Sequence, residues 1–161
     1  MPSILFVCTA NQIRSPMAAA MFRAALSAHP ERRSQNGVEG QEWRVESAGT
    51  WVKEGLPANR AAQQVMRELG LDLSHHRTRC VTGELLRQFD LILVMERNHK
   101  EALRVEFPAL RGRIRLCSEL AGGEWDVPDC AEGGEDEVRE AAKMIAGVLE
   151  RGRERIADLR F

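Results

Sequence analysis

The chain has 161 residues, of which 43% are hydrophobic and 29% are charged, as is ordinary for a soluble globular protein. This length is enough for one domain with a sizeable core, and we expect residues 1–161 to form a single domain. The formal net charge of −1 gives no bulk electrostatic reason to expect nucleic-acid or membrane binding.

The N-terminus and the cysteines give two further expectations. We expect no signal peptide, because a charged leading segment and a cleavage site are both missing. The four cysteines have no CxxC spacing, which fits neither a zinc site nor a disulfide scaffold. We therefore expect no metal and no cofactor, and a reducing cytoplasmic location that would keep a thiolate active.

The first predicted elements are a strand, a loop and a helix in direct succession. Residues 4–8 form an apolar run that is too short to span a membrane and predicts a buried strand. After a loop at 9–14, Ser15 and Pro16 predict a helix start, since serine is a good N-cap and proline suits the first turn. Residues 17–28 continue this helix with strong helix formers and an apolar stripe.

This loop predicts an oxyanion site with a nucleophile at its base. Consecutive backbone N–H groups before a helix N-terminus bind anions, and the same positive field favours the thiolate form of Cys8. Arg14 offers planar, bidentate donors that fit two phosphate oxygens, and Ser15 could hydrogen-bond the departing thiolate. A thiolate below a bound phosphate ester can displace the alcohol and form a cysteinyl-phosphate, which water then removes.

The segment Val7-Cys8-Thr9-Ala10-Asn11-Gln12-Ile13-Arg14-Ser15-Pro16-Met17-Ala18 resembles the phosphate-binding loop of low-molecular-weight protein tyrosine phosphatases. The resemblance implies that Cys8 is the nucleophile and that Arg14 holds the phosphate. It implies that Asn11 and Ser15 brace the loop, and asparagine tolerates a left-handed backbone. The phosphate-binding residues would then be Cys8, Thr9, Ala10, Asn11, Gln12, Ile13, Arg14 and Ser15.

A polar surface loop is expected at 30–41, followed by a strand at 43–48. This strand runs into Ser47-Ala48-Gly49-Thr50, which resembles the family segment whose serine, here Ser47, helps brace the phosphate loop. The resemblance also suggests that Gln12 and Trp51 line the substrate cleft. An exposed Trp would suit stacking on a planar substrate, and a Trp covering an edge of the core remains an alternative.

A helix is expected at 57–69, with Gly70 as its C-cap. The following segment, Leu71-Asp72-Leu73-Ser74-His75-His76-Arg77-Thr78-Arg79, resembles a family segment whose histidine, here His76, hydrogen-bonds beneath the phosphate loop. The pair His75-His76 could also suggest a metal, but no third ligand lies at metal spacing.

The middle of the chain predicts a short helix at 82–88, a strand at 90–95, a helix at 98–107 and an edge strand at 113–117. The run at 90–95 is apolar on both faces, as a central parallel strand requires. This alternation predicts an α/β fold with an open four-stranded parallel sheet flanked by helices on both faces. The resemblance implies the flavodoxin-like, phosphotyrosine phosphatase I type. Ligands of such sheets bind at the carboxyl ends of the strands, where Cys8 lies.

A Gly-rich loop at 120–134 precedes a long final helix expected at 135–159. In the family, an aspartate on this loop protonates the leaving oxygen, and the spacing to the last helix puts Asp129 in that role. Asp126 is the rival candidate. The proline that follows the family's aspartate is Cys130 here.

The sequence therefore predicts a cysteine-dependent phosphomonoesterase that hydrolyses protein phosphotyrosine through a cysteinyl-phosphate, with an aspartate as general acid. Arginine phosphate or a small aryl phosphate remains an alternative substrate. Gln12 stands where tyrosine phosphatases usually have an aliphatic residue and arginine-phosphate phosphatases a threonine. The expected partners are phosphorylated proteins, small aryl phosphates or similar oxyanions, with no nucleic acid and no membrane. The expected state is a monomer or weak dimer.

Two alternatives belong to other functional classes. A thiol-dependent arsenate reductase shares this fold and loop, but it needs further cysteines, and the first would follow the central strand, where this chain has Met95 and Glu96. A phosphate-binding module with weakened catalysis is the second, suggested by Ala10 in place of the usual glycine and by Cys130 in the acid loop.

Overall fold

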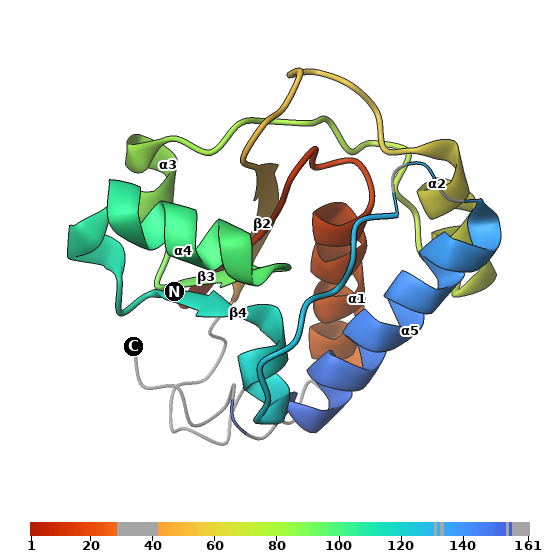
Figure 1. The fold of residues 1–161 in the computed structure, drawn as a ribbon. Helices are drawn as coiled ribbons and strands as arrows, with labels where there is room; N and C mark the ends of the chain where they lie inside the picture. Colours follow the sequence, from red (N-terminus) through yellow and green to blue (C-terminus); the bar gives the residue numbers. More distant parts are fainter. Residues whose placement is uncertain (29–41, 131, 133, 154, 156–161) are drawn as a thin grey trace.

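The computed structural model describes residues 1–28, 42–130, 132, 134–153 and 155. The polar loop expected at 30–41 lies outside the described residues, as does most of the end of the helix expected at 135–159. Strands and helices alternate along the chain (Figure 1). In chain order the elements are β1 (Ser3–Cys8), α1 (Arg14–Ala28), β2 (Arg44–Gly49), α2 (Arg60–Glu68), α3 (Gly83–Arg87), β3 (Leu91–Val94), α4 (Arg97–Glu106), η2 (Pro108–Leu110), β4 (Ile114–Leu116), η3 (Cys117–Ala121) and α5 (Glu135–Arg151).

The four strands form one parallel sheet in the order β2-β1-β3-β4. The central strand β1 is buried along its whole length and pairs with β2 on one side and β3 on the other. Its last residue, Cys8, is in register with Gly49 at the end of β2, and Val7 is in register with Val94 at the end of β3. The predicted four-stranded parallel α/β fold is confirmed.

Successive side chains of β1 point to opposite faces of the sheet, and each face has its own hydrophobic core. Leu5 and Val7 pack with residues of α3, α4 and η2 on one face. Ile4, Phe6 and Cys8 pack with residues of α1, α2 and α5 on the other face, where these helices lie in Figure 1. This alternation directs the side chain of Cys8 toward α1, the helix that follows the loop.

Two helix starts differ from the sequence prediction. The helix after the first loop begins at Arg14, so Ser15 lies in its first turn and not at the N-cap. The bond from Met17 N to Ile13 O, 3.1 Å long, begins the helical pattern inside the loop itself. The helix expected from residue 57 begins at Arg60, because the side chain of Asn59 accepts a hydrogen bond from Ala61 N at 2.8 Å and caps it there.

Candidate active site

The candidate site lies at the carboxyl end of the sheet, where β1 ends and the loop at 9–13 leads into α1. Five backbone carbonyls between Cys8 and Ile13 accept hydrogen bonds from groups outside the loop's inner side. Carbonyl oxygens of the loop accept hydrogen bonds as follows: Cys8 from Thr50 N at 2.9 Å, Thr9 from Trp51 N at 3.0 Å, Asn11 from His76 Nε2 at 2.6 Å, Gln12 from Asn59 N at 3.0 Å and Ile13 from Met17 N at 3.1 Å. In a trans peptide the N–H points away from the C=O, so the following N–H groups are directed toward the inside of the loop.

Asn11 holds the centre of the loop. It is fully buried and has a left-handed backbone with φ of 57°. Among the described residues, it is the only one other than glycine with a positive φ. Its Nδ2 donates to the hydroxyl oxygens of Ser15 at 2.8 Å and Ser47 at 3.0 Å, and its Oδ1 accepts from Arg79 N at 3.0 Å. The structure thus brings three of the four predicted bracing residues into direct contact.

The fourth predicted bracing residue, His76, donates its Nε2–H to the carbonyl of Asn11. Burial lowers the pKa of His76 below its ordinary value of 6.5, although the hydrogen bond to Asn11 opposes that shift. The ring is therefore kept neutral and serves as a fixed donor under the loop.

The sulfur of Cys8 is buried and lies 3.0 Å from the hydroxyl oxygen of Ser15. That oxygen already accepts a hydrogen bond from Asn11, so its own proton is available for an acceptor. The two acceptors in reach are the Cys8 sulfur and, at 3.3 Å, the carbonyl of Ala48. A thiolate is the charged acceptor of the two, and a hydrogen bond to a charged group is the stronger one.

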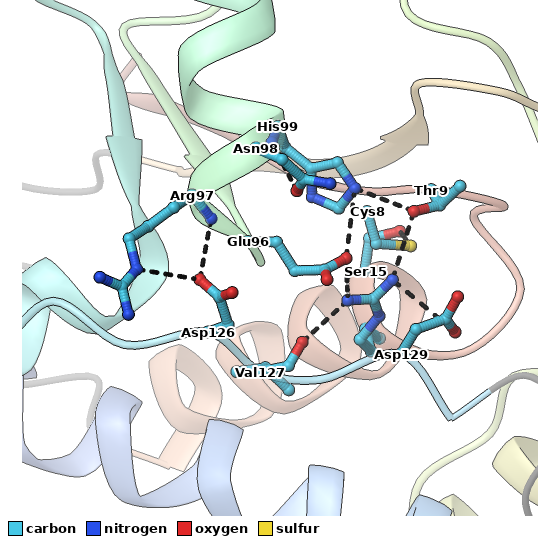
Figure 2. A network of polar contacts seen from close by, with 11 residues as sticks. Cys8, Thr9, Ser15, Glu96, Arg97, Asn98, His99, Asp126, Val127 and Asp129 are labelled. Carbon is cyan, nitrogen blue, oxygen red and sulfur yellow. Dashed lines mark hydrogen bonds and ion pairs between the residues drawn. The ribbon is translucent and has the colours of Figure 1, made fainter.

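Arg14 is 2% exposed, and both terminal nitrogens of its guanidinium contact oxygen atoms of other residues. Its Nη1 donates to Glu96 Oε2 and to the carbonyl of Val127, both at 2.8 Å. Its Nη2 lies 3.4 Å from Thr9 Oγ1 and 3.8 Å from Asp129 Oδ1 (Figure 2). This buried cation stands at the mouth of the loop with its terminal nitrogens fixed.

Sequence reasoning did not assign Glu96 and His99 to the site. Both residues follow β3, the strand beside β1. Their position after a neighbouring parallel strand is the sequence feature that could have identified them, because ligands bind at the carboxyl ends of such strands. His99 Nε2 lies 2.9 Å from Thr9 Oγ1 and 3.4 Å from Glu96 Oε2, while its buried Nδ1 has no hydrogen-bond partner in the described part of the chain. Burial lowers the pKa of His99, partly opposed by the Glu96 carboxylate.

The two aspartates of the acid loop point in different directions (Figure 2). Asp126 Oδ1 accepts a hydrogen bond from Arg97 N at 2.8 Å, at the beginning of α4. Asp129 instead faces Arg14, and its side chain is 53% exposed at the rim of the site. Between them, Val127 N donates to Met95 O at 2.9 Å and fixes the loop to the end of β3. The structure therefore brings Asp129, and not Asp126, toward the phosphate loop.

The remaining predicted residues lie around the rim or in the core. The side chain of Trp51 is 86% exposed, and Gln12 is partly buried. Ile13 is buried in the core, so it contributes to the loop through its backbone only. Among the described residues, no group of three or more His, Cys, Asp or Glu side chains is placed to hold a metal. No helix in this part of the chain has the length and apolar character to cross a membrane.

Comparison with known proteins connects this geometry to a family. The family model for low molecular weight phosphotyrosine protein phosphatase matches residues 3–157. The chain belongs to this family. It is therefore a phosphatase of the low molecular weight protein tyrosine phosphatase class, which acts on phosphorylated substrates.

Two relatives in the low molecular weight phosphatase family are named as phosphatases of different residues, tyrosine and arginine. A probable low molecular weight protein-tyrosine-phosphatase, EpsP of Ralstonia nicotianae, is 35% identical over 143 residues, which cover 89% of this chain and 88% of EpsP. A protein-arginine-phosphatase of Geobacillus stearothermophilus is 34% identical over 141 residues, covering 87% of this chain and 85% of that protein.

Solved structures of the family share the fold over nearly the whole chain. The low molecular weight protein tyrosine phosphatase from T. tengcongensis has a TM-score of 0.84 and 33% identity, covering 96% of this chain and 99% of that one. Vibrio vulnificus Wzb in complex with benzylphosphonate has a TM-score of 0.79 and 28% identity, covering 98% of this chain and 99% of that one.

Proposed function

We propose that this phosphatase hydrolyses phosphotyrosine on proteins in two steps, with Cys8 as the nucleophile, Arg14 as the phosphate-binding cation and Asp129 as the general acid. The observation that carries the proposal is the arrangement of the loop. The sulfur of Cys8 lies at the base of a ring of inward-directed N–H groups, with a fixed guanidinium at the mouth and a carboxyl group at the rim.

In the first step, the loop N–H groups and Arg14 hold the non-bridging oxygens of the phosphoryl group. The Cys8 thiolate attacks phosphorus from below, the bond from phosphorus to the phenolic oxygen breaks, and a cysteinyl-phosphate forms. The fixed donors stabilise the charge on the transferring group, because they are already oriented before the reaction. Ser15 donates a hydrogen bond to the sulfur and so stabilises the thiolate when it leaves phosphorus in the second step.

Asp129 supplies the proton that the leaving phenolate needs, and then accepts a proton from the water that attacks the cysteinyl-phosphate. Its partial exposure lets it meet a substrate that enters from solvent. Asp126 is unsuited to this role because its carboxylate accepts the backbone N–H of Arg97 at the beginning of α4.

Tyrosine is the favoured leaving group because Trp51 presents a large, exposed aromatic surface beside the loop, where its backbone N–H bonds Thr9 O. Such a surface can stack on a phenol ring. The family's tyrosine-phosphatase relatives support the same substrate. Arginine phosphate is the second candidate, supported by the arginine-phosphatase relative and by the polar side chain of Gln12 at the loop.

Matched peptides carrying phosphotyrosine or phosphoarginine separate these two substrates, with kcat/KM measured for the wild type, Trp51→Ala and Gln12→Ile. We expect the wild type to prefer phosphotyrosine and Trp51→Ala to lose that preference. A wild type that prefers phosphoarginine, together with a Gln12→Ile variant that loses this activity, would assign the arginine substrate instead.

Arsenate reduction is disfavoured by the placement of the other cysteines. Burial raises the pKa of Cys117 to about 12, so this thiol does not supply the thiolate that a reductase needs. Burial also raises the pKa of the Cys130 thiol. Turnover of p-nitrophenyl phosphate by the wild type, and its loss in Cys8→Ser, would exclude the non-catalytic phosphate-binding module. Absence of arsenate turnover with thioredoxin in the same preparation would exclude the reductase.

The proposal also includes a cytoplasmic location and a monomer or weak dimer. The cysteines support the location, since all four are free thiols and a reducing compartment would keep them so. Sedimentation of the purified chain over a range of concentrations tests the oligomeric state.

A further inference from the structure

Glu96, His99 and Thr9, which Figure 2 labels, form a closed ring of four contacts with the terminal nitrogens of Arg14. Arg14 Nη1 lies 2.8 Å from Glu96 Oε2, which lies 3.4 Å from His99 Nε2. The same nitrogen of His99 lies 2.9 Å from Thr9 Oγ1, which lies 3.4 Å from Arg14 Nη2. One imidazole nitrogen therefore contacts the partners of both terminal nitrogens of Arg14.

The surroundings of His99 decide which ring nitrogen carries the proton. A proton on Nδ1 would leave a buried N–H without an acceptor and would turn the lone pair of Nε2 toward the Glu96 carboxylate. A buried donor without a partner has lost its hydrogen bonds to water and gained none in the fold, which is unfavourable. A proton on Nε2 instead faces two oxygen acceptors, Glu96 Oε2 and Thr9 Oγ1. The ring is therefore a neutral Nε2–H donor, in agreement with the lowered pKa of His99.

The ring of contacts determines which donors of Arg14 face a ligand. Nη1 uses its two hydrogens on Glu96 and Val127, and Nη2 directs one hydrogen to Thr9. Asp129 Oδ1, at 3.8 Å from Nη2, is beyond hydrogen-bond distance. This leaves the Nε–H and the second hydrogen of Nη2 for one edge of the guanidinium, where they form a bidentate pair for a phosphoryl group. Besides Arg14 itself, His99 is the side chain among the described residues that contacts the Glu96 carboxylate, and so it helps to keep Glu96 on Nη1 and away from that edge.

We propose that His99 is a positioning residue of the phosphatase reaction: its Nε2–H holds Glu96 and Thr9 against the terminal nitrogens of Arg14, so that the guanidinium presents its Nε and Nη2 edge to the phosphoryl group. This inference rests on the phosphate-binding role proposed for Arg14. His99 is suited to a fixed position, since it is 5% exposed and lies in the first turn of α4. That turn is tied to the acid loop through Asp126.

Two amide variants form a matched test. In His99→Gln the side-chain amide nitrogen reaches the place of Nε2, whereas in His99→Asn it reaches only the place of Nδ1, which has no partner. Both variants remove the same ring from the same buried position. We expect His99→Asn to lose roughly 10- to 100-fold in kcat/KM for p-nitrophenyl phosphate and to bind vanadate correspondingly more weakly, while His99→Gln stays within severalfold of the wild type.

Thermal unfolding of both variants shows whether they fold equally well. Equal activity of the two folded variants, whether both retain the wild-type rate or both lose it to the same extent, would overturn the inference. If either variant fails to fold, a long-range proton–nitrogen NMR spectrum of the wild-type imidazoles decides the question. A proton on Nε2 of His99 is expected, and a proton on Nδ1 would overturn the inference.

An Arg14→Lys variant separates this inference from the proposed function. Full activity of Arg14→Lys would remove Arg14 from the mechanism and the inference with it. Loss of activity in Arg14→Lys, together with equal activity of the two His99 variants, would overturn the role of His99 alone.

Discussion

Replacing Asn11 with alanine tests how the phosphate loop is held in its anion-binding shape. The substitution removes the three side-chain hydrogen bonds to Ser15, Ser47 and the backbone N–H of Arg79, while the backbone must still adopt a φ of 57°. Buried hydrogen bonds contribute roughly 0.5–1.5 kcal/mol each, and a left-handed backbone costs alanine roughly 1–2 kcal/mol. The active loop conformation should therefore lose roughly 3–5 kcal/mol relative to alternatives.

A loss of this size lowers kcat/KM for p-nitrophenyl phosphate by at least roughly 100-fold, since each 1.36 kcal/mol corresponds to a factor of ten. The matched control is Asn11→Gly, which loses the same hydrogen bonds but adopts positive φ without strain. It should be roughly 5- to 30-fold more active than Asn11→Ala, and both should bind phosphate more weakly than the wild type in calorimetry. Activity of Asn11→Ala within threefold of the wild type, or equal activity of the two variants, would refute this account of the loop.

Three further predictions concern the general acid Asp129, the close packing of Gly49 against the phosphate loop, and the buried His76. Asp129→Ala should lower kcat for phenyl phosphate by roughly 10²- to 10⁴-fold, and for p-nitrophenyl phosphate by less, because nitrophenolate leaves without a proton; equal losses in steady-state assays would exclude Asp129 as the acid. Gly49→Ala should abolish most activity in a folded protein, because its Cβ would collide with Thr9 O and Val52 Cγ2; wild-type activity would contradict the tight packing of this loop. Burial lowers the pKa of His76 below 6.5, so the unfolded state binds more protons than the folded state in this range. The free energy of unfolding should therefore decrease as the pH is lowered below about 6.5. Thermal unfolding between about pH 5 and 7.5 should show this dependence, and His76→Gln should reduce it to the part that comes from His99, whose pKa is also lowered by burial. An unchanged dependence in His76→Gln would exclude His76 as a cause.

The sequence was most informative where local chemistry and chain order agree. The apolar run of β1 and the helix formers after the loop predicted both elements, and the alternation of elements predicted the parallel sheet. Because ligands bind at the carboxyl ends of parallel strands, the position of Cys8 could be predicted as well. The left-handed state of Asn11 agrees with what its residue type tolerates.

Contacts between distant parts of the chain were harder to predict. Serine is a residue type that favours the N-cap, but the hydroxyl of Ser15 instead forms hydrogen bonds with Cys8 and Asn11. Glu96 lies 82 positions from Arg14, and no spacing rule relates the two residues, so their ion pair required the register between β1 and β3. The same register brings His99 to Thr9. These contacts depend on which helix faces which loop, and residue patterns along one segment do not contain that information.

The most direct test of the mechanism is to trap the covalent intermediate. The Asp129→Ala variant is mixed with p-nitrophenyl phosphate, quenched rapidly and digested, and the peptides are analysed by mass spectrometry. Without the base that activates water, the second step slows, and we expect one phosphoryl group on the sulfur of Cys8, absent when Cys8 is also replaced by alanine. Continued release of nitrophenol with no phosphoryl group on Cys8, or with the group on another residue, would contradict the mechanism.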